Sequence, residues 1–178
     1  RFEKGNGEMK VFLRAENDKV RYVRLYWKTD VDQSALVLGD HWERSYADCE
    51  WLHPDAQRYL PWYFLITKEG VTSGVGVKVR PSAFVEFACD GSGVTCLLDV
   101  RNGSHGVELN GRELLAAVLV NETYKGISAF EAACEFCRRM CDDPILPDRP
   151  VYGSNNWYYA YGNSSHEDIL RDTELVAK

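Results

Sequence analysis

A cluster of amide and aromatic side chains near residue 157 is the part of the sequence best suited to binding chemistry. Asn155 and Asn156 stand directly before Trp157, and Tyr158 follows it. Aromatic rings stack on the apolar faces of sugar rings, and carboxamides offer hydrogen-bond donors and acceptors to sugar hydroxyls. An aromatic residue at the end of a strand also packs into cores. These residue types therefore indicate either a carbohydrate contact or a core position.

A loop near residue 40 brings acidic, basic and aromatic side chains close together in sequence. Its members are Asp40, His41, Trp42, Glu43, Arg44 and Asp48. Carboxylates beside a histidine suit acid–base chemistry. The simpler interpretation, which we favour, is a loop held by an ion pair from Glu43 or Asp48 to Arg44 and by a buried Trp42. A contact to another domain or to the rim of a substrate site is the main alternative.

Three cysteines recur at helical spacing, which is compatible with a metal site or a thiol-dependent redox centre. They are Cys134, Cys137 and Cys141. One continuous helix rarely directs three thiolates at one metal, and unpaired cysteines are among the most buried residue types. We therefore expect these side chains to pack in a core. The four histidines are scattered, and we expect no metal ion and no other cofactor.

The cluster around Trp157 is expected to lie between a strand and a helix. Pro150 interrupts the preceding segment, a short β-prone run follows it, and a Gly-Asn pair then indicates a turn. Ser164 and Glu167 match a capping box, which predicts a helix with Ser164 as its N-cap. The expected order is strand, loop and helix, with Pro150 and Val151 packed toward the domain that precedes them.

Short apolar runs that alternate with polar residues fill most of residues 9–119, and Asp-Gly or Asn-Gly pairs separate several of them. Such pairs adopt the positive φ of tight hairpin turns, so the pattern predicts an antiparallel β-sandwich. The runs at residues 9–14 and 20–28 are expected to pair as a hairpin, and residues 61–67 to form one strand. Three valines at alternate positions are expected to face one core: Val75, Val77 and Val79.

A helix is predicted directly after the sandwich. Ser128 and Glu131 form a second capping-box pattern, and apolar residues then recur at spacings of three and four, which indicates one buried face. That face comprises Phe130, Ala133, Cys134, Cys137, Met140 and Cys141. Residues 142–148, which are rich in Asp and Pro, are expected to link this helix to the final segment.

The stretch from Tyr152 to Tyr158, with the capped helix after it, resembles the first barrel strand of α-galactosidases (melibiases) and their relatives. In that family the opening reads roughly Gly, then Trp or a small residue, then Asn, then Ser or Asn, then Trp. The matching residues are Gly153, Asn155, Asn156 and Trp157, and Ser154 stands where many members carry Trp. Residues 38–48 together with 61–64 look like the N-terminal β-sandwich found ahead of the barrel in many bacterial relatives.

The resemblance implies both a fold and a site. The fold would be mainly β: a supersandwich-like antiparallel β-sandwich over residues 1–124, a bridging helix and linker over residues 125–148, and one βα unit of a truncated TIM barrel over residues 149–178. The family places the tryptophan of this motif in the sugar pocket. The substrate-binding residues would therefore be Trp157, Asn155, Asn156 and Tyr158, with Tyr159 and Tyr161 as weaker candidates that we expect to pack instead.

The implied activity is retaining hydrolysis of α-galactosides or related α-glycosides. Such enzymes use one aspartate as nucleophile and another as acid/base, about 5–5.5 Å apart, and both lie on later barrel strands. The chain has 178 residues, fewer than the roughly 250 of a complete barrel, so we expect an N-terminal fragment that is inactive alone. Its partners would be the remaining barrel and an α-galactoside-like carbohydrate. The alternative is a non-catalytic carbohydrate-binding or interaction sandwich.

The composition narrows the range of other partners. The chain has 21 basic and 27 acidic residues and a net charge of −6, without a basic cluster interleaved with aromatics, so nucleic acid is not an expected partner. No apolar run approaches the roughly 18 residues of a membrane span, so no membrane association is expected. The six cysteines do not suggest a disulfide-built domain. An oligomer is compatible with these features, and a secreted or periplasmic location is slightly favoured over a cytoplasmic one.

Overall fold

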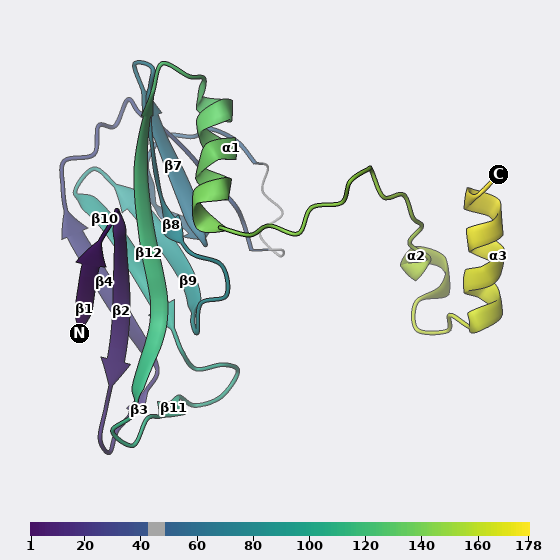
Figure 1. The fold of residues 1–178 in the computed structure, drawn as a ribbon, viewed down its shortest axis with the longest axis horizontal. Coiled ribbons are helices and arrows are strands. Elements are labelled where there is room, and N and C mark those ends of the chain that lie inside the picture. The colour runs from purple at the N-terminus through teal and green to yellow at the C-terminus, as the bar shows by residue number, and fades with distance from the viewer. Residues whose placement is uncertain (43–48) are drawn as a thin grey trace. The chain divides into compact units, whose positions relative to one another are not determined.

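The computed structural model describes residues 1–42 and 49–178, and the chain divides into two compact units (Figure 1). The first unit is Arg1–Asp142 and the second is Asp143–Lys178. Glu43, Arg44 and Asp48, for which an ion pair was expected, lie outside the described residues. The two units are considered separately below.

Among the described residues, the first unit contains two large antiparallel sheets. The six-stranded sheet has the order β1 (Phe2–Gly5), β2 (Glu8–Arg14), β12 (Glu113–Lys125), β8 (Val71–Val77), β7 (Tyr63–Lys68) and β5 (Leu36–Gly39). The four-stranded sheet has the order β4 (Tyr22–Lys28), β10 (Gly93–Asp99), β9 (Phe84–Asp90) and β6 (Asp55–Pro61). A small third sheet pairs β3 (Lys19–Val20) with β11 (Val107–Glu108). The expected mainly β class with antiparallel sheets is confirmed.

The two large sheets share one hydrophobic core, as in a β-sandwich. Phe64 of β7 meets Phe87 of β9 with ring centroids 5.6 Å apart, and Cys96 and Leu98 of β10 are fully buried in the same cluster. Of the three valines expected to face this core, Val77 is buried and Val75 packs against it. Val79 is 52% exposed, so its predicted position is wrong, because β8 ends at Val77.

The predicted hairpin between residues 9–14 and 20–28 is also wrong. β2 pairs with β1 and β12 in the six-stranded sheet, whereas β4 pairs with β10 in the other sheet. Each sheet takes one strand, and each strand contributes its apolar face to the shared core, with Val11 from β2 and Leu25 from β4. Consecutive strands in this unit therefore cross between layers as well as pair within them.

The single strand predicted over residues 61–67 is divided by Trp62 into β6 and β7, which belong to different sheets. Trp62 has a φ of 68°, in the left-handed region that a bulky side chain rarely adopts. Its N–H donates to the carbonyl of Val85 at 2.9 Å, and its carbonyl accepts from the N–H of Val77 at 3.1 Å. Trp62 is therefore the point at which the chain crosses from one sheet to the other.

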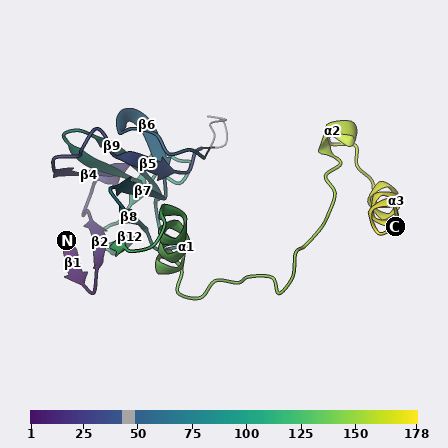
Figure 2. The ribbon, with the colours of Figure 1, turned by 90° about the horizontal axis from the view of Figure 1, so that it is seen from above.

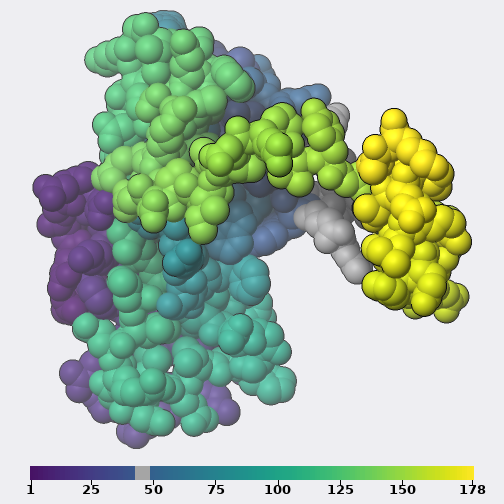
Figure 3. Space-filling model, turned by 45° about the vertical axis from the view of Figure 1, so that its right-hand side comes forward, coloured from purple at the N-terminus to yellow at the C-terminus, as the bar shows by residue number. Residues whose placement is uncertain are grey.

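Helix α1 (Ala129–Met140) begins at the predicted capping box, in which Ser128 Oγ accepts from Glu131 N–H and the Glu131 carboxylate accepts from Ser128 N–H. The helix packs on the outer face of the six-stranded sheet, against β8 and β12 (Figure 2). In the space-filling view of Figure 3, the green atoms of β12 and α1 lie next to one another. α1 is therefore part of the first unit.

The buried face of α1 matches the predicted one at Met140 but otherwise differs from it. Its buried residues are Ala132, Phe136 and Met140, whereas Phe130 is 76% exposed and Cys137 is exposed. Two glycines of β8 explain the difference. A Cβ on Gly74 would lie 2.5 Å from Cδ2 of Phe136, and one on Gly76 would lie 2.8 Å from Sδ of Met140. The face of α1 that carries Phe136 and Met140 therefore packs against the sheet, because these side chains fit over the two glycines.

A partly buried charge network fixes the C-terminal end of α1. Arg139 Nη1 lies 3.0 Å from Glu8 Oε1 of β2, and its Nη2 donates to the carbonyl of Asn6 at 2.8 Å. Lys78 lies 3.5 Å from the same Glu8 oxygen and also pairs with Asp142. Arg139 lies in the last turn of α1, where its charge also complements the helix dipole.

The second unit contains a short helix, α2 (Trp157–Ala160), and a longer one, α3 (His166–Val176). The strand predicted before Trp157 is not formed, and residues 151–156 have no regular secondary structure. A strand is stabilised by its neighbours, and within this unit no other strand is available to pair with it. The prediction of a strand, loop and helix is therefore correct for the loop and for the helix only.

Gly74→Ala is expected to lower the free energy of unfolding of the first unit by about 1–3 kcal/mol, because the added methyl group overlaps the Phe136 ring and the helix must shift. Urea denaturation followed by circular dichroism measures this change. Gly5→Ala is the control, since a Cβ there meets no heavy atom within 4 Å, and its effect should stay within about 0.5 kcal/mol. Equal losses in the two variants would contradict the close contact.

Candidate functional site

The residues predicted to bind substrate lie at the start of α2, where Asn155 fixes the backbone of Trp157. Asn155 Oδ1 accepts a hydrogen bond from the N–H of Trp157 at 2.9 Å. This contact spans two residues and forms an Asx turn, which satisfies one of the N–H groups that a helix start leaves without a partner. The amide oxygen of Asn155 therefore positions the tryptophan.

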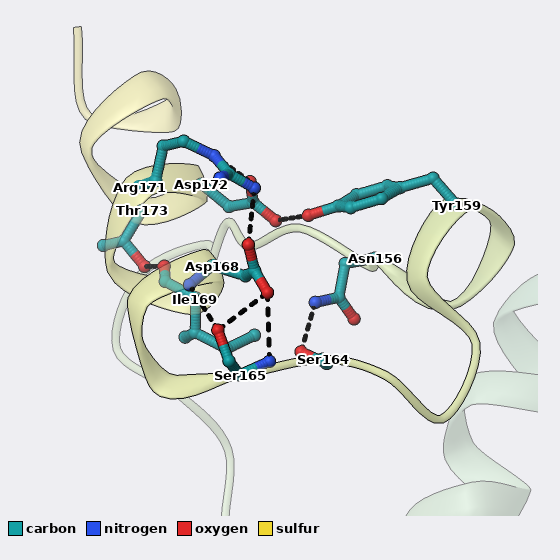
Figure 4. Close-up of polar contacts among 9 residues, drawn as sticks. All are labelled: Asn156, Tyr159, Ser164, Ser165, Asp168, Ile169, Arg171, Asp172 and Thr173. Carbon is teal, nitrogen blue, oxygen red and sulfur yellow. Dashed lines mark hydrogen bonds and ion pairs between the residues drawn. The ribbon is translucent and has the colours of Figure 1, made fainter.

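Asn156 holds the far side of the same loop. Its Nδ2 donates to Ser164 Oγ at 2.7 Å, across the turn between α2 and α3 (Figure 4). The turn begins at Tyr161, whose φ of 50° places it in the left-handed region, and the N–H of Asn163 donates to the carbonyl of Ala160 at 2.9 Å. Asn156 thus fixes the loop, and it shares this function with Asn155.

Tyr159 joins α2 to α3. Its hydroxyl donates to the Asp172 carboxylate, which Figure 4 shows reaching from the middle of α3. This hydrogen bond raises the pKa of the Tyr159 phenol, because a neighbouring carboxylate disfavours the phenolate. Arg171 lies 2.8 Å from Asp168 and 3.9 Å from Asp172, so a compact polar cluster ties the two helices together. Within this unit, Tyr159 therefore has a structural contact.

Trp157 and Tyr158 both have rings that remain open to solvent, as do Tyr159 and Tyr161, which are 59% and 61% exposed. Trp157 is 56% exposed, and its ring meets Tyr161 edge-on, with centroids 5.8 Å apart and an angle of 70°. Tyr158 is 83% exposed. An indole held by its backbone and contacted at one edge leaves a flat apolar surface, which suits stacking on a sugar ring.

One detail of the predicted unit requires correction. The N-cap of α3 is Ser165, whose Oγ accepts from the N–H of Asp168 at 3.2 Å, and the expected pair of Ser164 and Glu167 does not form the cap. The Ser165 contacts lower the pKa of the Asp168 carboxyl. The packing of Pro150 and Val151 against the preceding domain stays a prediction.

The loop near residue 40 leads to a second group of aromatic side chains, in the first unit. Trp42 Nε1 donates to Glu86 Oε2 at 3.1 Å, and the indole lies edge-on to Trp62 and Phe84. Trp42 is 36% exposed and so is only partly buried, where full burial was expected. Asp40 N-terminal to it accepts from the N–H of His41 at 2.8 Å.

The same aromatic group borders a cavity of about 260 Å³, which the sequence analysis did not identify. Its lining comprises Trp42, Phe84, Glu86, Leu97, Asp99 and Arg101. These residues come from a loop, two strands and the segment after one of them, so no local motif contains them. The signal available in the sequence was the alternation of β9 and β10, which places a carboxylate on the outward face of each strand.

The three cysteines of α1 and its C-cap do not form a metal site in the part of the chain that the structure describes. No group of three or more His, Cys, Asp or Glu side chains there is arranged to hold a metal ion. Cys134 and Cys141 are partly buried, but Cys137 is exposed, so the expected burial is wrong for that residue. Cys137 follows the buried Phe136 by one position, about 100° round the helix, so it lies beside the buried face and not within it.

Ser165→Ala should destabilise α3 by about 1 kcal/mol, because the hydroxyl that caps the first turn is removed. Ser164→Ala is the matched control: it removes only the contact with Asn156 and should leave the helix intact. The ¹³Cα chemical shifts of residues 166–172 report the helical population in both variants. A larger loss of helix in the Ser164 variant would restore the cap expected from the sequence.

Comparison of the chain with known protein families, with curated proteins and with solved structures found no match. No helix in the described part of the chain is long and apolar enough to cross a membrane. The functional assignment therefore depends on the motif around Trp157 and on the geometry that surrounds it.

Proposed function

We propose that this chain carries the N-terminal β-sandwich and the first βα unit of a retaining α-galactosidase-like glycoside hydrolase, with Trp157 as a sugar-stacking residue. The observation that carries the proposal is the exposed indole of Trp157, fixed by the Asn155 side chain within the Gly-Ser-Asn-Asn-Trp motif. The resemblance of that motif to the family supports the sugar class, and the geometry supports a ring that is oriented and accessible.

The packing of the second unit supports the same proposal. Within residues 143–178 taken by themselves, no residue is buried. Large apolar side chains remain exposed on α3, including Ile169, Leu170 and Leu175. A helix with an exposed apolar face gains stability when that face is covered. In the proposed enzyme, the face of α3 would pack against the first strands of the barrel, and residues 151–156 would pair with a neighbouring strand.

The proposed division of labour assigns binding to this chain and bond cleavage to other residues. The nucleophile and the acid/base of a retaining enzyme stand about 5–5.5 Å apart on either side of the glycosidic bond. In the second unit, the Asp168 carboxylate caps α3 and the Asp172 carboxylate accepts from Tyr159. Because these carboxylates have structural roles, the contribution of this unit is substrate stacking by Trp157, with the exposed Tyr158 beside it.

Trp157→Ala, made in the protein that contains the complete barrel, should weaken sugar binding by about 1–3 kcal/mol, because the sugar loses its apolar contact area. Its melting temperature should change little, since the ring is more than half exposed. Kinetics with p-nitrophenyl α-galactoside and thermal melting measure the two effects. Tyr59→Ala is the control, because Tyr59 is an aromatic residue of similar exposure, 58%, in the first unit.

A wild-type kcat/KM together with a large drop in melting temperature would show that Trp157 is a core residue. The pocket assignment would then be withdrawn. A loss of affinity in both the Trp157 and the Tyr59 variants would point to a general effect of removing surface aromatics and would count equally against the assignment.

The polypeptide of residues 1–178 should show no enzymatic turnover of p-nitrophenyl α-galactoside, since the proposed function places both catalytic carboxylates elsewhere. Hydrolysis should stay at the rate of the buffer alone. Turnover of about 1 s⁻¹ or faster, in the range of ordinary enzymes, that persists after repurification would contradict this division. It would direct attention to the carboxylates of the first unit.

A further inference from the structure

The cavity beside Trp42 lies on the outer face of the four-stranded sheet, at a place that the alternation of the strands defines. Val85, Phe87, Cys96 and Leu98 are buried in the core between the sheets. Their neighbours along the strands therefore face outward. The pairing register sets Asp99 opposite Phe84 and Leu97 opposite Glu86. Four side chains of two adjacent strands thus form the floor of the cavity.

One wall of the cavity is aromatic and is held in place from behind. Trp42 contacts Phe84 and Trp62 edge-on, with ring centroids 6.1 and 5.8 Å away, and Trp62 lies 6.0 Å from Phe84. Trp62 is fixed by its hydrogen bonds to both sheets and packs against the core. Phe84 nevertheless remains 53% exposed. The cluster therefore presents an open phenyl face on a rigid support.

The polar groups of the cavity are positioned by contacts that leave them further hydrogen-bonding capacity. Glu86 Oε2 accepts from Trp42 Nε1 at 3.1 Å, and a carboxylate has about four acceptor sites. Asp99 accepts from Arg101 Nε at 3.0 Å and from its Nη2 at 2.5 Å, which lowers the pKa of the Asp99 carboxyl. A guanidinium has five N–H donors, and Asp99 does not accept from all of them, so Arg101 has donors left for a ligand.

From this combination we propose that the cavity is a second carbohydrate site, which binds one ring of a neutral hexopyranose. The ring stacks on Phe84, a hydroxyl donates to Glu86, and another hydroxyl accepts from Arg101. The volume of about 260 Å³ lies just below the roughly 300–1,000 Å³ of typical small-molecule sites, so a single sugar ring fits better than a larger cofactor. The site lies within the sandwich, and it holds whether or not the second unit belongs to a hydrolase.

The charges of the cavity favour a neutral ligand over an anion. Among the described lining residues, Asp99 and Arg101 neutralise one another and Glu86 adds one negative charge, and the whole chain carries −6. A phosphate or carboxylate ligand would be repelled. The hydroxyl groups of a sugar, in contrast, satisfy carboxylate acceptors and guanidinium donors at the same time.

The test is a titration of ¹⁵N-labelled protein with three probes, the methyl α-glycosides of galactose, glucose and mannose. With at least one probe, we expect saturable shifts of the amides of Phe84, Glu86, Leu97 and Asp99, together with the indole Nε1–H of Trp42. Phe84→Ala should weaken that binding by about tenfold, and Tyr59→Ala, an exposed aromatic on the same sheet outside the cavity, by less than about twofold. The residues whose signals shift separate this site from Trp157, which belongs to the second unit.

If Phe84→Ala proves unstable, Glu86→Gln serves as a second variant. It keeps an acceptor for Trp42 and preserves the size of the side chain. It should weaken sugar binding while the melting temperature stays close to that of the wild type. The proposal fails if none of the three glycosides gives saturable shifts, if the shifts map to other residues, or if inorganic phosphate binds the cavity instead. An equal loss in the Tyr59 variant would also overturn it.

Discussion

The passage of the chain between two sheets at Trp62 is the constraint on which the first unit depends. One residue donates to Val85 in the four-stranded sheet and accepts from Val77 in the six-stranded sheet. Its left-handed backbone costs on the order of 1–3 kcal/mol for a bulky side chain, and the core that both sheets share offsets this cost. The same backbone conformation directs the indole toward Trp42 and Phe84, so the aromatic wall of the cavity is a direct product of the crossing.

Around β8 the six-stranded sheet packs on both faces, against the other sheet on one side and against α1 on the other, which explains why part of its packing could not be predicted from sequence. Along β8, Val75 and Val77 face the other sheet, whereas Gly74 and Gly76 face α1. The helix sequence alone is compatible with several buried faces, since cysteine, alanine and phenylalanine are all apolar. The choice of Phe136 depends on two glycines about sixty residues away, and that information is tertiary. The capping box of α1, by contrast, is local and was predicted correctly.

The same distinction between local and tertiary information applies to the strands and to the second unit. Asn-Gly and Asp-Gly turns mark strand ends from their own φ preferences, but pairing partners are set by the core, and β2 and β4 fall in different sheets. In α3 the capping pattern occurs twice, because adjacent serines each stand three residues before an acid. The motif around Trp157 was recognisable because it is contiguous. The cavity was not, because its lining is gathered from separate strands.

The two aromatic surfaces therefore differ in what each needs in order to bind a sugar. Trp157 has a ring contact with Tyr161 and lies in a unit without a buried residue, so further walls must come from outside residues 143–178 before its indole forms a pocket. Phe84 already has a floor of two strands, an aromatic wall and charged groups in fixed positions. Stacking gains affinity only when the ring is held and water is excluded around it. The sugar binding proposed for the sandwich can consequently be tested with the first unit's own residues, whereas the binding proposed for Trp157 requires residues outside 143–178.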